Sequence, residues 1–176
     1  RALAGLEAIR LSKEYLRAYR VVIYLATEEV EAAAEKVANE TGIPISILPL
    51  GPREEVLRLH GSARVSIGLS LSDGVSTSML ESIMMGSFPI QSNTACANEW
   101  IVDGETGLIV PPEDPLAVAA ALRQALLDDD LVDRAAARNA NVVAERLERT
   151  IIQPQVIAMY QRIAAQAAAK NRMNLV

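Results

Sequence analysis

Short apolar runs alternate with helical patterns along most of this chain, and this alternation limits the possible folds more than any other feature. Parallel strands need long crossover connections, so the alternation is typical of a parallel sheet with helices on both faces. The sequence therefore predicts an α/β fold, a Rossmann-like doubly wound parallel sheet in three layers, within a single domain over 1–176. We expect strands at 21–25, 45–48, 65–69, 88–91 and 107–110, with helices at 2–17, 28–41, 53–59, 76–86 and 98–102.

Extra helices are predicted for the C-terminal end, over about 130–169. Asp114 followed by Pro115 is a typical helix start, with an acidic N-cap and proline in the first helical position. A further helix is expected at 130–148. Pro154 is expected at the beginning of the last one, which the pattern starts near Gln153.

Composition narrows the class of protein. Hydrophobic residues make up 51% and charged residues 22% of 176 positions, which is typical of a globular chain. The net charge is −5 and the 17 basic residues are scattered, so neither nucleic acid nor an anionic membrane is an expected partner. No apolar stretch approaches about 20 residues, so no membrane-spanning segment is expected. A single cysteine, Cys96, fits a reducing cytoplasm.

The most informative stretch for function is 72–86. A strand-like run ends in a turn centred on Gly74, and a helical pattern begins at about Ser76. The free N–H groups of Val75, Ser76 and Thr77 would point at a ligand, and the helix dipole adds partial positive charge. Gly74 would let a phosphate approach the backbone. This stretch is therefore a candidate anion site.

Glu81 follows within the same predicted helix. At about 1.5 Å per residue it lies roughly 7–8 Å down the axis from the helix start, with its side chain tilted back toward that start. One helix could thus hold a diphosphate at its tip and hydrogen-bond a ribose diol through Glu81. Two plainer interpretations stay open: Ser78 and Glu81 match a capping box, and Asp73 with Gly74 is a common turn pair.

The segment from Asp73 to Glu81 resembles the acidic pair, separated by seven residues, of retaining glycosyltransferases with two facing Rossmann-like domains. These are the GT-B type enzymes of glycosyl transferases group 1. The resemblance continues through 86–92, 97–112 and 113–119. It implies that the chain is the C-terminal, donor-binding domain and that Glu81 holds the ribose hydroxyls of a nucleoside-diphosphate sugar. Asp73, where the family usually has Glu, is implied as the catalytic residue beside the donor sugar and its departing phosphate.

The resemblance implies further donor contacts. The backbone of Leu50 and Gly51, after a predicted strand, would face the nucleobase, and Glu99 would lie near the wall of the donor pocket. An ordinary Gly–Pro turn is an equally good interpretation of the segment with Leu50 and Gly51. In the alternative interpretation of the Glu99 segment, Trp100 and Ile101 are core residues and Glu99 is a surface acid.

The implied reaction moves a hexosyl group from the nucleotide-sugar to an acceptor hydroxyl, in polysaccharide or glycolipid synthesis. The nucleoside-diphosphate sugar is the donor substrate, and no cofactor and no metal are implied.

The chain opens on a helical pattern, so we expect a fragment that lacks an N-terminal acceptor-binding domain, together with the Arg and Lys that bind the donor diphosphate. This fragment is expected to be inactive alone and cytoplasmic, with peripheral membrane association through the missing half. Two alternatives remain: a non-catalytic nucleotide-sugar-binding or regulatory module, and a sugar-nucleotide epimerase domain.

Other chemistries find little support. His60 is the only histidine and ends a short predicted helix, so it is expected to be a surface or capping residue. One His and one Cys do not make a structural zinc site. No serine lies in a nucleophile elbow, which argues against a hydrolase.

Overall fold

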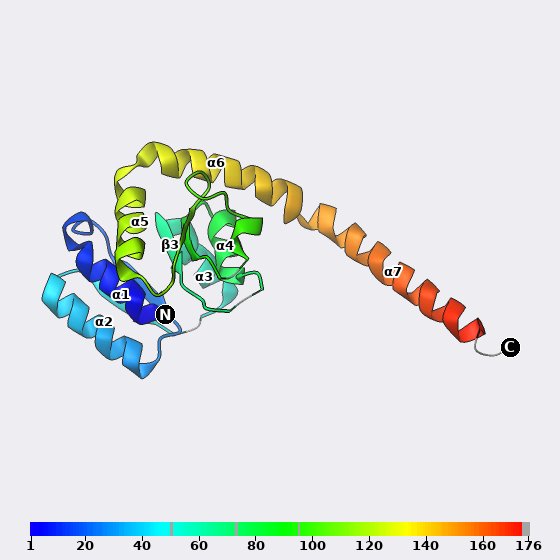
Figure 1. Ribbon diagram of the computed structural model, residues 1–176, viewed down its shortest axis with the longest axis horizontal. Helices are drawn as coiled ribbons and strands as arrows, with labels where there is room; N and C mark the ends of the chain where they lie inside the picture. The colour runs from blue at the N-terminus through cyan, green and yellow to red at the C-terminus, as the bar shows by residue number, and fades with distance from the viewer. Residues whose placement is uncertain (50, 73, 95, 174–176) are drawn as a thin grey trace. The chain divides into compact units, whose positions relative to one another are not determined.

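Figure 1 shows the computed structural model of the chain, which describes residues 1–49, 51–72, 74–94 and 96–173. The chain divides into two compact units, Arg1–Ala140 and Asn141–Val176. All strands belong to the first unit. They are β1 (Val21–Tyr24), β2 (Ile45–Leu48), β3 (Val65–Gly68), β4 (Phe88–Ser92) and β5 (Leu108–Val110).

Every strand pairing is parallel, as the alternating pattern predicts. β1 pairs with β2, with Val21 opposite Ile45. β4 lies between β3 and β5, with Phe88 opposite Val65 and Ile90 opposite Leu108. Because β4 is paired on both sides, all five of its residues are buried. The α/β fold with a parallel sheet is therefore confirmed.

The strands form two hydrogen-bonded groups, β1-β2 and β3-β4-β5. One hydrophobic core contains residues from both groups, among them Ile23, Ile47, Phe88 and Ile90. The two groups fit the doubly wound strand order 3-2-1-4-5-6. In that order β2 and β1 take positions 3 and 2, and β3, β4 and β5 take positions 4, 5 and 6. Within the described part of the chain, no strand takes position 1, between β1 and β3. β1 is half-buried along its length, and β3 is half-buried except at the exposed Ile67, although both stand near the centre of that order.

Helices cover both faces of the strands. In Figure 1, α1 and α5 lie side by side with α2 next to α1, while α3 and α4 lie across the strands from them. The main core fills the space between the strands and the α1, α2 and α5 side. The bounds of the helices in this unit are Ala2–Leu11 (α1), Glu28–Thr41 (α2), Arg53–Ser62 (α3), Thr77–Met84 (α4), Pro115–Leu127 (α5) and two 3-10 turns, Lys13–Tyr15 and Ala97–Glu99.

The first helix is shorter than the sequence predicts. α1 ends at Leu11, because the N–H of Ser12 turns back to the carbonyl of Ile9, and a separate 3-10 turn follows. The start of α5 is confirmed in detail. Asp114 Oδ1 accepts hydrogen bonds from the N–H groups of Leu116 and Ala117, at 2.9 and 3.1 Å, and Pro115 is the first helical residue.

Two helices follow, α6 (Asp129–Arg146) and α7 (Arg149–Met173). α6 begins in the first unit, and α7 belongs to the second. Pro154 lies inside α7, so the prediction that it begins the last helix is wrong. The N–H groups of Ile151 and Ile152 already bond to the carbonyl of Glu148. None of the helices described is long and apolar enough to span a membrane.

Candidate functional site

The loops that follow β1, β2, β3 and β4 share one edge of the fold, because the carboxyl ends of parallel strands point the same way. The backbone at this edge is strained in two places. Leu25, directly after β1, and Cys96, after β4, both have left-handed conformations, with φ of 58° and 47°. Such strain at non-glycine residues is typical of ligand-binding loops. Two hydroxyls, of Ser92 and Thr94, bond the carbonyl of Ser70 at 2.7 and 2.6 Å and tie the loop after β3 to the end of β4.

The N-terminus of α4 opens at this edge. Ser76 is its N-cap, and the hydroxyl oxygen of Ser76 accepts a hydrogen bond from the N–H of Met79 at 3.4 Å. Gly74, Val75 and Thr77 are exposed, and Ser76 is half-buried. The four residues predicted to meet a diphosphate therefore lie together at an accessible helix start.

Glu81 lies in the second turn of α4 and is buried, with 8% of its surface exposed. The capping-box interpretation is wrong, because Ser76 rather than Ser78 caps the helix. The side chain of Ser78 accepts instead from the hydroxyl of Tyr24, at 3.0 Å. A buried carboxylate in an eight-residue helix that begins at this edge calls for a charged partner.

That partner is Arg53, which the sequence does not point to. Arg53 is the first residue of α3, and its Nε donates to Glu81 Oε1 at 3.2 Å. The Arg53 side chain is 67% exposed, whereas the Glu81 side chain is 10% exposed. The ion pair therefore joins a buried acid to a cation at the protein surface, directly after the Gly51–Pro52 turn.

His60 is buried, so the prediction that it is a surface or capping residue is wrong. Its exposed fraction is 6%, and its Nδ1 lies 2.9 Å from the hydroxyl of Ser66, which in turn contacts Ser87 at 2.8 Å. The ring of Tyr24 packs edge-on against it, with centroids 6.2 Å apart. Burial lowers the pKa of His60, and the nearby charge of Glu81 opposes this only in part. A buried His60, with its pKa below the ordinary value, thus lies near the acid of the candidate site.

The segment that carries Glu99 packs against α4. Met79, Ala97 and Ile101 form a small buried cluster, with Trp100 half-buried against it. Trp100 and Ile101 are therefore core residues, as one of the two interpretations has it. Glu99 is exposed on the adjoining 3-10 turn, and its contact with a donor stays a prediction.

Two predicted residues, Asp73 and Leu50, lie outside the described residues. Gly51 is half-buried just before α3, where a Cβ atom would come within 2.5 Å of Glu55 Oε2. Its contact with a nucleobase also stays a prediction. The described site therefore consists of Gly51, Arg53, the 74–77 segment and Glu81.

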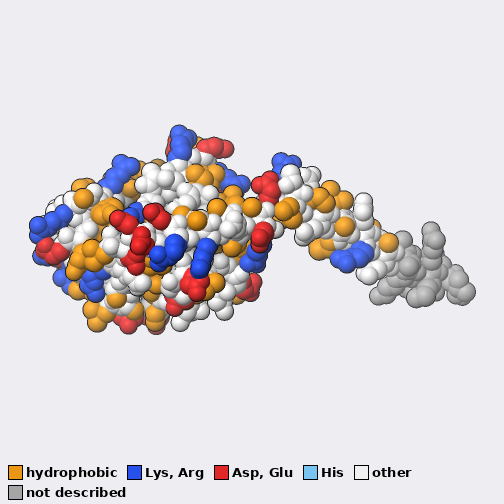
Figure 2. Space-filling model, turned by 90° about the horizontal axis from the view of Figure 1, so that it is seen from above, with side chains coloured by type: hydrophobic (Ala, Val, Ile, Leu, Met, Phe, Trp, Pro, Cys, Tyr) orange, Lys and Arg blue, Asp and Glu red, His pale blue; other side chains and the backbone are white. Residues whose placement is uncertain are grey.

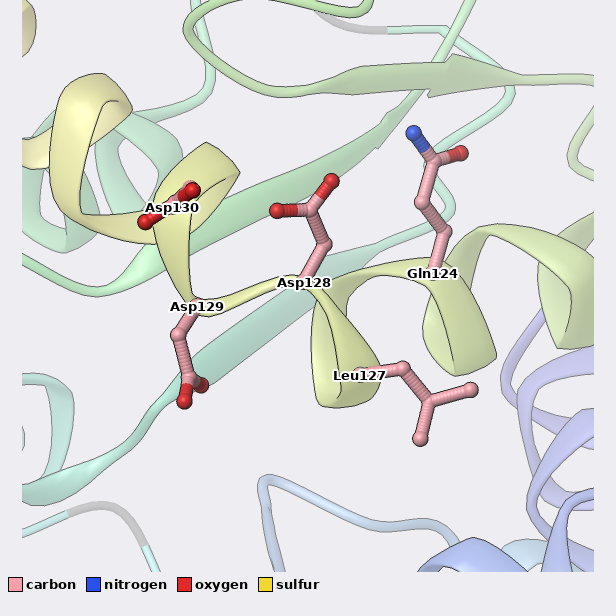
Figure 3. A pocket seen from close by; sticks show the side chains of 5 residues that line it. All are labelled: Gln124, Leu127, Asp128, Asp129 and Asp130. Atoms are coloured by element: carbon pink, nitrogen blue, oxygen red, sulfur yellow. The ribbon is translucent and has the colours of Figure 1, made fainter.

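A pocket lies apart from this site. Figure 3 shows Gln124, Leu127, Asp128, Asp129 and Asp130 lining a pocket at the junction of α5 and α6. Asp128 accepts from the N–H of Leu131, and Asp129 pairs with Arg64 at 2.6 Å. Arg64 directly precedes β3, so this pocket lies at the amino end of the strands, away from Gly74. Asp128 and Asp129 therefore already have partners within the fold.

Positive and negative side chains are mixed on one face of the molecule. On the face seen in Figure 2, Lys and Arg side chains are interspersed with Asp and Glu. Within the described ranges, no three His, Cys, Asp or Glu residues are grouped so that they could hold a metal ion.

Comparison with known proteins identifies the family. The sequence model of the family glycosyl transferases group 1 matches residues 5–142. This range includes every strand described and the whole candidate site. The chain belongs to this family. It is also 32% identical over 98 residues to a D-inositol 3-phosphate glycosyltransferase of Corynebacterium urealyticum, a match that covers 54% of this chain and 23% of that protein.

Solved structures have the same fold. The C-terminal domain of a glycosyl transferase group 1 protein, LpcC of Francisella tularensis, matches with a TM-score of 0.74 and 19% identity, over 83% of this chain and 78% of that one. HepE of Anabaena, in complex with UDP-glucose, matches with a TM-score of 0.75 and 11% identity, over 90% of this chain and 44% of that one. The group 1 family thus accounts for the fold, which is that of the C-terminal Rossmann-like domain of GT-B glycosyltransferases.

Proposed function

We propose that this chain is the donor-binding half of a retaining glycosyltransferase that moves a hexosyl group from a nucleoside-diphosphate sugar to an acceptor hydroxyl. The observation that carries the proposal is the position of the buried Glu81 on α4, close to the accessible segment 74–77 that leads into this helix. The Anabaena neighbour with UDP-glucose bound supports a donor of this class.

The N–H groups at the start of α4 suit the leaving group. When the bond between the anomeric carbon and the diphosphate oxygen breaks, positive charge builds on the sugar ring and negative charge on the diphosphate. Val75, Ser76 and Thr77 would stabilise the diphosphate through backbone donors and the helix dipole. Asp73 is the proposed catalytic residue, next to the sugar. Protein donors neutralise the leaving group in this proposal, so it includes no metal and no cofactor.

Glu81 would accept hydrogen bonds from the two ribose hydroxyls, with Gly51 and Leu50 at the nucleobase and Glu99 at the pocket wall. A second, N-terminal domain would bind the acceptor, and the Arg and Lys that complete the diphosphate site would lie on a strand and loop that precede α1. The chain by itself is therefore proposed to bind donor weakly and to transfer no sugar. A role in polysaccharide or glycolipid synthesis in the cytoplasm, peripheral to the membrane through the second domain, completes the proposal.

Glu81→Gln tests the ribose assignment in the 176-residue chain. Charge-assisted hydrogen bonds contribute about 1.5–3 kcal/mol each, so we expect nucleotide affinity, measured by calorimetry or NMR titration with UDP, GDP and ADP, to fall roughly tenfold or more. The matched control is Glu105→Gln, which also removes an ion pair, with Arg138, but lies outside the site. Equal nucleotide affinity in all three proteins would contradict the proposal.

A further inference from the structure

The contact between Arg53 and Glu81 joins two separate parts of the site. Arg53 begins α3, directly after the Gly51–Pro52 turn, and Glu81 lies 28 residues later on α4. The bond runs from Nε to a single oxygen, Oε1, at 3.2 Å. Arg53 therefore stands between the turn predicted to meet the nucleobase and the acid proposed to meet the ribose.

Glu81 depends on this contact for its orientation. Its side chain is 10% exposed, and a buried carboxylate is costly unless a charged partner bonds to it. Among the described residues, Arg53 alone lies within ion-pair distance of Glu81. Burial lowers the pKa of His60, the other basic group near it.

Arginine suits this position better than lysine. Its five N–H donors lie in one plane, so Nε can hold an oxygen of Glu81 while the terminal nitrogens stay at the surface. A fixed Oε1 also fixes the direction of the second carboxylate oxygen. That oxygen, with the remaining lone pair of Oε1, is then available to a diol.

We propose that Arg53 is a positioning residue for ribose recognition: it holds the Glu81 carboxylate in the orientation that reads the two ribose hydroxyls. The inference rests on the proposed function, since it requires that Glu81 meets the ribose. Arg53 acts through Glu81 and through no bond of its own to the reacting atoms.

The test compares a ribonucleotide with its 2′-deoxy counterpart. The probe is whichever of UDP, GDP and ADP the 176-residue chain binds most tightly, and the readout is the ratio of its affinity to that of the 2′-deoxy nucleotide. We expect Arg53→Met to weaken ribonucleotide binding roughly fivefold and to leave the deoxynucleotide nearly unchanged, so that the ratio falls. Arg53→Lys should restore part of the ratio. The matched control is Arg58→Met on the same helix, whose exposed side chain bonds the carbonyl of Glu54.

A general loss of packing would lower both affinities together, and so it would not move the ratio. An unchanged ratio in Arg53→Met, or tighter ribonucleotide binding, overturns the positioning role. Glu81→Gln distinguishes the positioning role of Arg53 from the ribose assignment of Glu81. If Glu81→Gln lowers the ratio and Arg53→Met does not, only the role of Arg53 is wrong. If neither variant changes it, or if none of the three nucleotides binds, the ribose assignment of Glu81 has failed as well.

Discussion

The hydroxyl of Tyr24, at the end of β1, donates a hydrogen bond to the side-chain oxygen of Ser78 on α4, at 3.0 Å. The two residues are 54 positions apart and belong to different strand groups, since α4 follows β3. Because β1 and β3 share no backbone pairing, this side-chain bond is one of the links between the two groups. It also fixes the first turn of α4, where the proposed diphosphate site lies.

Tyr24→Phe should therefore destabilise the first unit. The change removes one hydrogen bond between half-buried groups, which contributes about 0.5–1.5 kcal/mol, and we expect the free energy of unfolding in urea to fall by that amount. Tyr15→Phe is the control, because Tyr15 is 42% exposed and should be nearly neutral. Similar losses from both changes would mean that the Tyr24 hydroxyl does not link the two groups.

A pH dependence should follow from the burial of His60. Its pKa in the folded state is lowered from the ordinary value of 6.5, since burial outweighs the opposing charge of Glu81. Ser66 and Tyr24 contact its ring, and Ser66 in turn contacts Ser87. Below pH 6.5 the unfolded state thus binds a proton that the folded state resists. We expect the free energy of unfolding to be constant just above pH 6.5 and to fall as the pH is lowered toward the folded-state pKa.

His60→Asn provides the comparison. Asparagine can keep a polar contact with Ser66 but has no group that titrates in this range. Urea denaturation between pH 7.5 and 5.5 should therefore show the decline in the unsubstituted chain and a flatter profile in the variant. Parallel profiles would show that His60 is not the group responsible.

The order of the elements was predictable from sequence because it depends on local signals. Apolar runs of strand length, and the Asp114–Pro115 helix start, are decided within a few residues, and the structure confirms them. Where the predictions from sequence are wrong, the structure is determined by contacts between residues that are far apart in the sequence. His60 is buried because side chains of β1 and β3 pack against it, and Ser12 after α1 is buried where its hydroxyl meets the Ala119 carbonyl, 107 residues away.

The same distinction holds for the candidate site. The helix start at 74–77 and the position of Glu81 follow from the spacing within one helix. Arg53 has no such signal, because it is one of several charged residues at the start of α3 and meets Glu81 only through the packing of α3 on α4.

Gly107 should tolerate no side chain. A Cβ atom there would come within 2.8 Å of Ile101 Cγ2 and of both the ring and the carbonyl oxygen of Pro89. The carbonyl belongs to the central strand β4 and cannot move aside without disturbing the strand pairing. We expect Gly107→Ala to lower the free energy of unfolding by about 1–3 kcal/mol, a typical cost of overpacking, in a thermal or urea melt. A melt unchanged from that of the original chain would contradict this account.

Gly74→Ala should leave stability almost unchanged, and it tests the proposed anion site most directly. A Cβ atom at Gly74 meets nothing within 4 Å, so we expect the free energy of unfolding to change by less than about 0.5 kcal/mol. A phosphate that approaches the backbone at this turn would meet the added methyl group, and so the affinity for a nucleoside diphosphate should fall. The affinity for the corresponding nucleoside, which has no phosphate, should stay the same. Calorimetric or NMR titration of both ligands against the variant measures the difference. If diphosphate and nucleoside are weakened equally, or neither is weakened, the phosphate does not bind at the start of α4.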